Sequence, residues 1–341
     1  MPITLEEIAK LSGVSRSTVS RVVNGHKRVR EETRKKVQSV IDELNFQPNI
    51  AARSLAAGKT GIMGLVIPAG VSALFSDPYF PQLIQGISSA CNKRDYSMML
   101  WVDEPNYRLR TIRQLLYSGL LDGVIISSML MDDPIIKSLY ERHMPFVLIG
   151  RHTELNVNYI DVNNQAAANK ATSFLIDCGY SRIATITGPI NMIAGYDRYQ
   201  GYCTALDQHG LALNDSLIAE GDFTEVGGYN TMKQLIPHNP DSVFIANDTM
   251  AMGALRALHE AGLRVPDDIG VIGFDDSPIA SLTTPPLTTM RQSPYDMGFK
   301  AVNTLIEIIN NQGRSPQQIV LESELVIRES CQRKEFAKEA I

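Results

Sequence analysis

The feature of this sequence that most constrains its fold is a series of short apolar runs that begins at residue 62 and alternates with helical stretches. The runs are IMGLVI (62–67), SMMLWV (97–102), GVIISS (123–128), PFVLIG (145–150), IATITG (183–188), SVFIAN (242–247) and IGVIGFD (269–275). Segments such as PQLIQGISSACNKR and NQAAANKATSFLIDC lie between them and have helical patterning. Apolar strands that alternate with helices form parallel sheets covered on both faces. Seven units are many for one doubly wound sheet, so we predict two similar α/β lobes with a break near residue 160.

Polar residues stand at the ends of several of these runs, where sheets of this kind bind ligands. Asn and Asp end the runs near 247 and 275, an Arg follows the run at 183–188, and Asp-Pro-Tyr-Phe (77–80) follows the first run. Such groups beside aromatic rings are typical of a sugar site, because they bind hydroxyl groups while the rings pack on C–H surfaces. The alternative is that each acidic residue only caps a helix. Asp248, directly before TMAMGALRALHEAG, is the best candidate for that role.

The first 60 residues are basic, whereas the rest of the chain is acidic. They contain 11 Lys and Arg against 6 Asp and Glu, while the remainder contains 21 against 31. A basic segment on an acidic body indicates that only this segment meets a polyanion. On charge alone, a solvated basic face is an equally good interpretation.

The residue pattern within the basic segment predicts a helix-turn-helix. Thr4 and Glu7 have the spacing of a capping box for a helix over about residues 5–11, and Gly13 suits a tight turn. Ser15 is the next natural N-cap. The second helix has an inward stripe of valines: Val19, Val22 and Val23. Two short helices joined in this way place the second in the major groove of DNA, and a third helix is expected over about residues 31–44.

The outward face of the second helix carries side chains of the kinds that bind DNA: Arg16, Ser17, Ser20, Arg21 and Asn24. Arginine binds guanine through two hydrogen bonds, and serine binds base edges and phosphates. An amphipathic helical hairpin without a role in DNA binding is the alternative. The turn glycine, the two N-caps and the positive face together favour the helix-turn-helix.

The segments TLEEIAKLSGVSRSTVSRVVNG and FQPNIAARSLAAGKT resemble the head of the lactose/galactose repressor family of bacterial transcription factors. The resemblance implies that the helix-turn-helix binds DNA through Thr4, Ser15, Arg16, Ser17, Thr18, Ser20, Arg21 and Asn24. It also implies a hinge helix over residues 49–57 that lies in the minor groove and binds through Asn49, Ala52, Arg53 and Leu55. An apolar side chain such as Leu55 is able to wedge into a base step and kink the duplex. Phe46 stands where the family usually has tyrosine, so a hydroxyl contact is missing there.

The segments DPYF, GP…DRYQGY, ANDTMAMGAL and GFDDSP are similar to cleft segments of the same family. This resemblance reaches about residue 330 and implies a two-lobed fold like that of periplasmic sugar-binding proteins, in which the chain crosses between the lobes three times. It implies that an effector is bound by Asp77, Tyr79, Phe80, Arg198, Phe223, Asn247, Asp275 and Gln292. The aromatic residues among them favour a disaccharide or glucoside, together with Trp101 unless it belongs to the core. Arg151 follows PFVLIG, where an acidic residue would also suit a sugar, so the first-lobe contacts stay open.

We therefore expect an all-α helix-turn-helix head (1–48) and a hinge helix with linker (49–61), followed by an α/β two-lobed effector-binding and dimerisation domain (62–330) with two parallel doubly wound sheets. The N-lobe is expected to comprise 62–161 and 293–320, and the C-lobe 162–292 and 321–330. The tail (331–341) is too short for the leucine heptad by which some family members tetramerise, so a homodimer is expected.

The expected function is sequence-specific transcriptional regulation. A dimer would repress carbohydrate-utilisation genes from a pseudo-palindromic operator in double-stranded DNA, and a small sugar between the lobes would change its affinity for that operator. Neither a cofactor nor a metal ion is expected. The scattered cysteines at 91, 178, 203 and 331, the absence of a long apolar stretch and the absence of a signal-peptide pattern predict a cytoplasmic protein without membrane contact.

Two other classes of protein are alternatives. A sugar-modifying enzyme could use the pair Asp275-Asp276, but no nucleophile–base pair, HExxH motif or complete phosphate loop is present. The trio Gly58-Lys59-Thr60 resembles the end of a phosphate loop, yet Arg53 occupies the position that requires glycine. A sugar-binding module with a vestigial head is the second alternative, and the missing export signal weighs against it.

Overall fold

The computed structural model describes residues 3–23, 28–46, 59–67, 71–102, 119–127, 130–131, 133–311, 313 and 315–331 of the 341-residue chain. The chain divides into two compact units, Met1–Gly61 and Ile62–Ile341. None of the helices within the described ranges is both long and apolar enough to cross a membrane.

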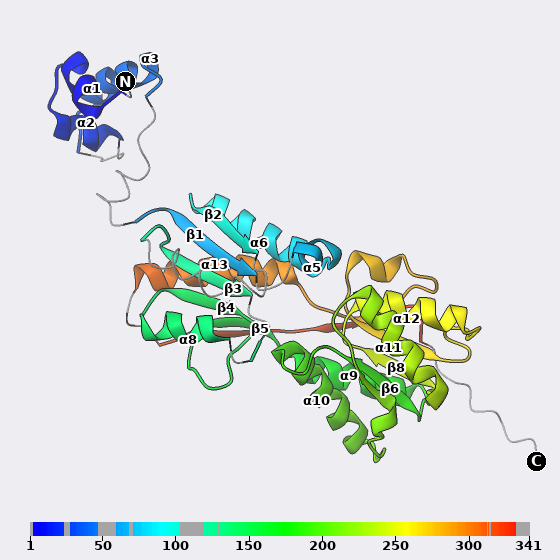
Figure 1. Ribbon diagram of the computed structural model, residues 1–341. Coiled ribbons are helices and arrows are strands. Elements are labelled where there is room, and N and C mark those ends of the chain that lie inside the picture. Colours follow the sequence, from blue (N-terminus) through cyan, green and yellow to red (C-terminus); the bar gives the residue numbers. More distant parts are fainter. Residues whose placement is uncertain are drawn as a thin grey trace, which may run out of the picture. The chain divides into compact units, whose positions relative to one another are not determined.

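The first unit contains three helices, α1 (Leu5–Ser12), α2 (Arg16–Val23) and α3 (Glu31–Glu43) (Figure 1). The predicted capping box is confirmed, because Thr4 Oγ1 accepts the Glu7 N–H at 3.3 Å and Glu7 Oε2 accepts the Thr4 N–H at 2.8 Å. Gly13 has a φ of +64°, which only glycine adopts readily and which turns the chain into α2. Ser15 Oγ accepts the Thr18 N–H at 3.2 Å and so caps α2.

A small core holds these three helices together. Its fully buried members are Ile8, Ala9, Val19, Val22 and Val37. Val23 and the residue that departs from the family pattern, Phe46, are half-buried against this cluster. The inward stripe predicted for α2 is therefore confirmed, and the opposite face of α2 remains open to solvent.

The second unit contains two six-stranded sheets (Figure 1). The first sheet, in spatial order, consists of β11 (Gln318–Leu321), β5 (Tyr159–Val162), β4 (Phe146–Ile149), β3 (Gly123–Ser127), β1 (Ile62–Ile67) and β2 (Ser97–Val102), all parallel. The second consists of β12 (Glu324–Val326), β10 (Thr288–Arg291), β9 (Gly270–Asp275), β8 (Ser242–Ile245), β6 (Ile183–Thr187) and β7 (Ile218–Glu220). Only β12 runs antiparallel to its neighbour among these pairs.

All seven predicted strands are present, and the other five are short. The unpredicted strands β5, β7, β10, β11 and β12 have only three or four residues and carry polar side chains. Three of them, β7, β11 and β12, lie at sheet edges, where burial demands less apolar sequence. The other two, β5 and β10, are inner strands, but Asp161 in β5 and the two threonines and Arg291 in β10 interrupt any apolar run.

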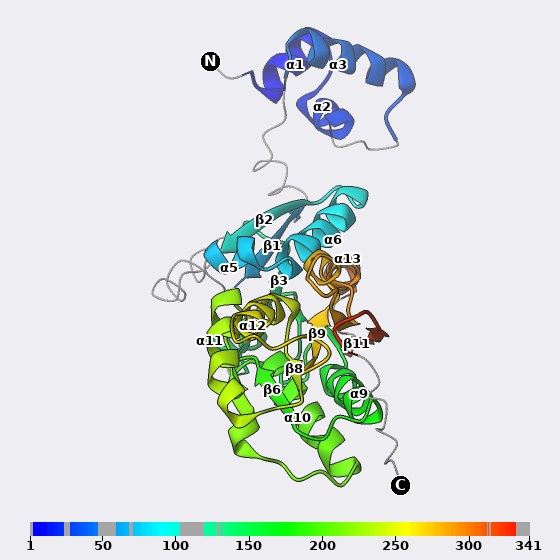
Figure 2. The same ribbon diagram turned by 90° about the vertical axis from the view of Figure 1, so that its right-hand side faces the viewer.

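Helices cover both faces of each sheet. On the first sheet, α6 (Tyr79–Lys93) and α13 (Pro294–Asn310) lie side by side on one face, and α8 (Pro134–Glu141) lies on the other (Figure 1, Figure 2). On the second, α9 (Asn164–Asp177) and α10 (Ile193–Gln208) cover one face, and α11 (Glu225–Leu235) and α12 (Asp248–Glu260) cover the other. Successive side chains of β8 point to opposite faces of the sheet. Val243 and Ile245 face α11 and α12, while Phe244 faces α9 and α10.

Short elements complete the unit. They are α5 (Val71–Ser76) and three single turns of 3₁₀ helix at Asp215–Leu217, Ile236–His238 and Pro278–Ser281. We call the first sheet with its helices the first lobe and the second sheet with its helices the second lobe. The chain passes between the two sheets after β5, β10 and β11, which gives three crossings. The residue limits expected for the domains and lobes stay a prediction.

Candidate functional site

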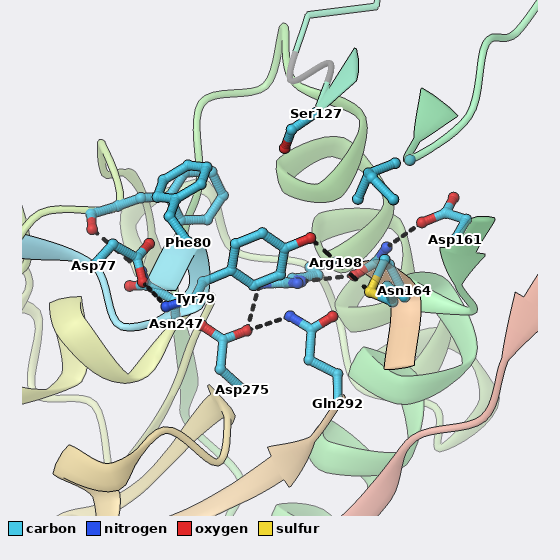
Figure 3. Close-up of a pocket in the computed structure, with 14 residues that line it drawn as sticks. Asp77, Tyr79, Phe80, Ser127, Asp161, Asn164, Arg198, Asn247, Asp275 and Gln292 are labelled. Atoms are coloured by element: carbon cyan, nitrogen blue, oxygen red, sulfur yellow. Dashed lines mark hydrogen bonds and ion pairs between the residues drawn. The ribbon is translucent and has the colours of Figure 1, made fainter. Parts of the chain in front are cut away.

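A cavity lies where strands of both sheets end (Figure 3). First-lobe residues in its wall are Asp77, Tyr79, Phe80, Ser127, Ile149, Gly150, Asp161 and Met297. The second lobe contributes Asn164, Arg198, Phe223, Asn247 and Asp275, and Gln292 lies on the segment that returns from β10 to α13. The structure thus brings all eight residues predicted to bind an effector into one wall.

Six further residues of the wall were not predicted. Ser127 and Gly150 lie at the ends of predicted strands, and Asp161 and Asn164 flank the predicted break between the lobes. Their positions in the sequence are therefore of the kind that indicates a ligand site. Ile149 and Met297 had no polar signal at all. Trp101, by contrast, is half-buried against the core cluster beside α8 and does not line the cavity, so it belongs to the core.

Arg198 is the buried cation of the site. Only 5% of the residue is exposed, and its guanidinium carbon lies 3.6 Å from the centre of the Phe274 ring. Its Nε donates to Asn164 Oδ1 at 2.9 Å, its Nη1 donates to the Ala246 carbonyl, and Nη1 lies 3.8 Å from Asp275 Oδ1. Burial lowers the pKa of Arg198, and Asp275 opposes this effect. The planar guanidinium is therefore fixed on three sides and faces the cavity with its remaining donors.

Asp275 is the carboxylate that faces this cation. Its backbone has a φ of +115°, a strained value for a residue with a side chain, of the kind that clusters at functional sites. The Gln292 amide donates to Asp275 Oδ1 at 2.5 Å. Burial raises the pKa of Asp275 well above its ordinary value, and Asp77 adds to the rise while Arg198 opposes it. Arg198, Asp275 and Gln292 thus offer a row of donors and acceptors along one wall.

The residue that caps α12 is Asn247, so the expectation that Asp248 has this role is wrong. Asn247 has an extended backbone, and its Oδ1 accepts the Met250 N–H at 2.9 Å while its amide donates to the Phe223 carbonyl. Asp248 is already inside the helix and fully buried, where it accepts hydrogen bonds from the Ser277 N–H and the Thr289 hydroxyl. Burial raises the pKa of Asp248 to about 7. Its contacts tie α12 to the turn that follows Asp275.

Three aromatic rings line the cavity, two from the first lobe and one from the second. The Tyr79 and Phe80 rings meet edge to face with centres 5.5 Å apart, and the Asp77 carboxylate accepts the Tyr79 N–H at 3.0 Å. Burial raises the pKa of Tyr79, so its hydroxyl keeps its proton. The Phe223 ring packs so closely on Gly188 that a Cβ atom there would lie 2.1 Å from it. Glycine at 188 is therefore what lets this ring reach its place.

Helix α2 and its N-cap Ser15 carry six of the twelve residues predicted to bind DNA. Ser15, Arg16, Ser17 and Arg21 are exposed, and Thr18 and Ser20 are half-buried. The Ser15 hydroxyl also contacts the Ser17 and Thr18 hydroxyls at 2.8 and 2.9 Å. Arg16 lies 3.3 Å from Glu6 with both side chains in solvent, a pair of the kind that contributes little and separates easily. Thr4 is exposed at the start of α1, where it forms the capping box. The remaining predicted contacts lie outside the described residues: Asn24, Asn49, Ala52, Arg53 and Leu55.

Comparisons with known families match both units. Residues 4–49 match the bacterial regulatory proteins of the lacI family, and residues 172–331 match the periplasmic binding protein-like domain. The HTH-type transcriptional regulator CelR of Thermobifida fusca is 38% identical over 332 residues, which covers 96% of this chain and 98% of the relative. The ribose operon repressor of Escherichia coli K12 is 35% identical over 334 residues, which covers 96% of this chain and 99% of the relative.

Two solved structures extend the likeness to the fold. The complex of the transcriptional regulator CelR with cellobiose has a TM-score of 0.77 and 36% identity, and the alignment covers 96% of this chain and 99% of that one. The lac repressor dimer bound to operator and the anti-inducer ONPF has a TM-score of 0.86 and 28% identity, with coverage of 97% and 100%.

Proposed function

This chain belongs to the lacI family of bacterial regulatory proteins, and from that premise we propose that its effector is a disaccharide of the cellobiose kind whose binding releases the operator. As a member of the family it is a DNA-binding transcriptional repressor controlled by an effector, and it is not an enzyme. We further propose that it acts in the cytoplasm as a homodimer on a pseudo-palindromic operator.

The observation that carries the sugar proposal is the convergence of one charged pair and three aromatic rings in a single buried cavity. Arg198 and Asp275 supply opposite charges 3.8 Å apart, which suits adjacent hydroxyl groups that both donate and accept hydrogen bonds. Tyr79, Phe80 and Phe223 supply flat faces for the C–H surface of sugar rings. The CelR relative, which is solved with cellobiose, supports a disaccharide.

The proposed mechanism uses the contribution of both lobes to one wall. A ligand that touches Arg198 and Asp275 in one lobe and Asp77 and Tyr79 in the other favours one angle between the lobes. Its effect on operator binding is limited to its difference in affinity for the two arrangements, for which about 1–3 kcal/mol is typical. We infer that this angle sets the spacing of two heads in a dimer, as half-sites about one helical turn apart require.

On the DNA side, we propose that Arg16, Ser17 and Arg21 on the exposed face of α2 read base edges, while Ser15 and Ser20 bind phosphates. The hinge residues, with Leu55 as the wedge, are proposed from the sequence alone. The lac repressor relative, solved as a dimer on its operator, supports both the assembly and the DNA partner.

Fluorescence anisotropy on labelled DNA from the upstream region of the gene tests this proposal. The protein is titrated onto that DNA and onto a random sequence of equal length, and then glucose, ribose, maltose, lactose and cellobiose are added in turn. We expect specific binding that cellobiose relieves. If every sugar that binds instead tightens the complex, the effector is a co-repressor and the proposed sign is wrong. If no sugar changes the binding and none binds the free protein, the effector is not a sugar.

A further inference from the structure

A carboxylate that the sequence did not single out lies in the first-lobe wall of the cavity. Asp161 is the third residue of β5, and only 4% of it is exposed. Figure 3 shows its carboxylate beside the Asn164 amide, on the rim of the cavity shared with Arg198. A buried carboxylate at a ligand cavity is costly unless it is paired or hydrogen-bonded.

One carboxylate oxygen of Asp161 accepts two hydrogen bonds, whereas the other accepts a single long one from Arg151. Oδ1 accepts the Val162 N–H at 2.8 Å and the Asn164 amide at 3.4 Å. Within the described part of the chain, Oδ2 is approached only by Arg151 Nη1 at 3.4 Å. That distance exceeds the value of about 2.7–2.9 Å for a charge-assisted hydrogen bond. Oδ2 therefore keeps the capacity to accept a hydrogen bond from a molecule in the cavity.

The cation beside Asp161 is held by the opposite lobe. Arg151 follows β4 in the first lobe, and its guanidinium binds Asp197 on α10 of the second lobe through both terminal nitrogens, with 2.7 Å between Nη2 and Oδ1. Asp197 is 3% exposed and directly precedes Arg198 in the helix. A bidentate ion pair of this kind fixes the orientation of the guanidinium and also brings opposite charges together. The place of Arg151 beside Asp161 therefore depends on how the lobes are arranged.

We propose that Asp161 selects the effector by accepting a hydrogen bond from one of its hydroxyl groups, and that Arg151 positions this carboxylate while bound to Asp197. The inference rests on the proposed sugar effector and names the residues that decide which sugar is accepted. A site built to bind a hydroxyl group rejects an analogue that lacks it, because the buried acceptor then has no donor. Oδ2 supplies the acceptor, and the ion pair between Arg151 and Asp197 holds the Arg151 guanidinium beside it.

A purely structural role for Asp161, in which it only balances the charge of Arg151, predicts a different outcome. In that case its replacement changes stability but not the discrimination between sugars. The ionisation state does not separate the two roles. Burial raises the pKa of Asp161 to about 6 and Arg151 opposes the rise, so the group is an acceptor at neutral pH under either reading.

Isothermal titration calorimetry with cellobiose and its monodeoxy analogues tests the selective role. We expect wild-type protein to bind one analogue about 10-fold or more weakly than cellobiose, because that analogue lacks the hydroxyl group that donates to Asp161. Asp161→Asn and Asp161→Ala should weaken cellobiose binding and bring its affinity close to that of this analogue. Asp161→Glu keeps the carboxylate and should retain part of the discrimination. Thermal unfolding of each variant shows that the fold is intact.

Replacements of the ion pair test the positioning role. Arg151→Gln and Asp197→Asn should each weaken cellobiose binding, and the double variant should be no weaker than either one, because the two act as a unit. Arg256→Gln is the matched control, since it breaks an exposed ion pair with Glu225 inside the second lobe and away from the cavity wall. It should bind cellobiose as the wild type does.

The outcomes separate this inference from the proposed function. If the wild-type protein binds no sugar, the proposed function fails and the inference fails with it. If it binds cellobiose and Asp161→Asn discriminates among the analogues as before, only the selective role is overturned. Independent, additive effects of Arg151→Gln and Asp197→Asn would overturn the positioning role.

Discussion

Replacing Gly188 by alanine is expected to weaken sugar binding by displacing the ring of Phe223. A Cβ atom at position 188 would lie 2.1 Å from Cζ of that ring, whereas ordinary contact begins at 3.4 Å. The ring must therefore move by about 1.3 Å, the difference between these distances. The other two atoms nearest to the new Cβ belong to the same ring, so the clash falls on this one side chain.

The size of the effect follows from that overlap. Forcing an extra carbon into a packed site costs about 1–3 kcal/mol. If the displaced ring loses its contact with the sugar by a similar amount, the dissociation constant rises by about 5- to 150-fold. Stability is expected to suffer less than affinity, because Phe223 is only half-buried and its ring tip can turn away.

Calorimetry with cellobiose and thermal unfolding measure the two effects, with Phe223→Ala and the double variant completing a cycle. The clash needs both side chains, so Gly188→Ala should have no further effect once Phe223 is alanine. Wild-type affinity in Gly188→Ala, or additive losses in the double variant, would refute the reasoning.

Arg16→Gln combined with Ser17→Ala should change the preferred operator sequence by about 1–3 kcal/mol at the contacted base pair while sugar affinity stays at the wild-type level. Anisotropy on operator variants measures this, and an unchanged preference would remove both residues from base recognition. Specific DNA affinity should fall steeply as salt rises, because phosphate contacts release counterions, and a flat salt titration would contradict this. Burial raises the pKa of Asp248 from 3.8 to about 7, so the folded state holds this proton more tightly, and the stability it gives below pH 3.8 is lost as pH rises through 7. Urea unfolding across that range should show a shallower decline for Asp248→Asn, and an unchanged slope would assign the decline to other groups.

The sequence predicted seven strands and the head because the signals there are strong and local. The run at 62–67 became β1 without a change of boundary, and the capping box at Thr4 and Glu7 formed as its spacing requires. The edge strand β12 (Glu324–Val326) was missed, since three residues with a charged first member carry no period. Short edge strands are decided by their neighbours in space, which a single sequence does not reveal.

In the site, too, the sequence pattern predicted individual residues but did not predict contacts between residues. Residues at strand ends such as Asp275 were predicted, because topology alone sends them to the cavity. The exchange of roles between Asn247 and Asp248 was not predicted, since two adjacent acceptors are equally good caps until the backbone chooses between them. The partnership of Arg151 with Asp197 joins residues 46 positions apart in different lobes, and no local pattern encodes it.

The crossing of the chain between its two sheets has a consequence for how the protein is made. The first sheet receives β11 from residues 318–321 and the second receives β12 from residues 324–326, so neither sheet is complete until almost the whole chain has left the ribosome. The head, within Met1–Gly61, depends on none of these strands. At about 5–20 residues per second, the head therefore emerges tens of seconds before its sensor exists. Each newly made chain therefore contains the residues of its head before it has a cavity in which a sugar could bind.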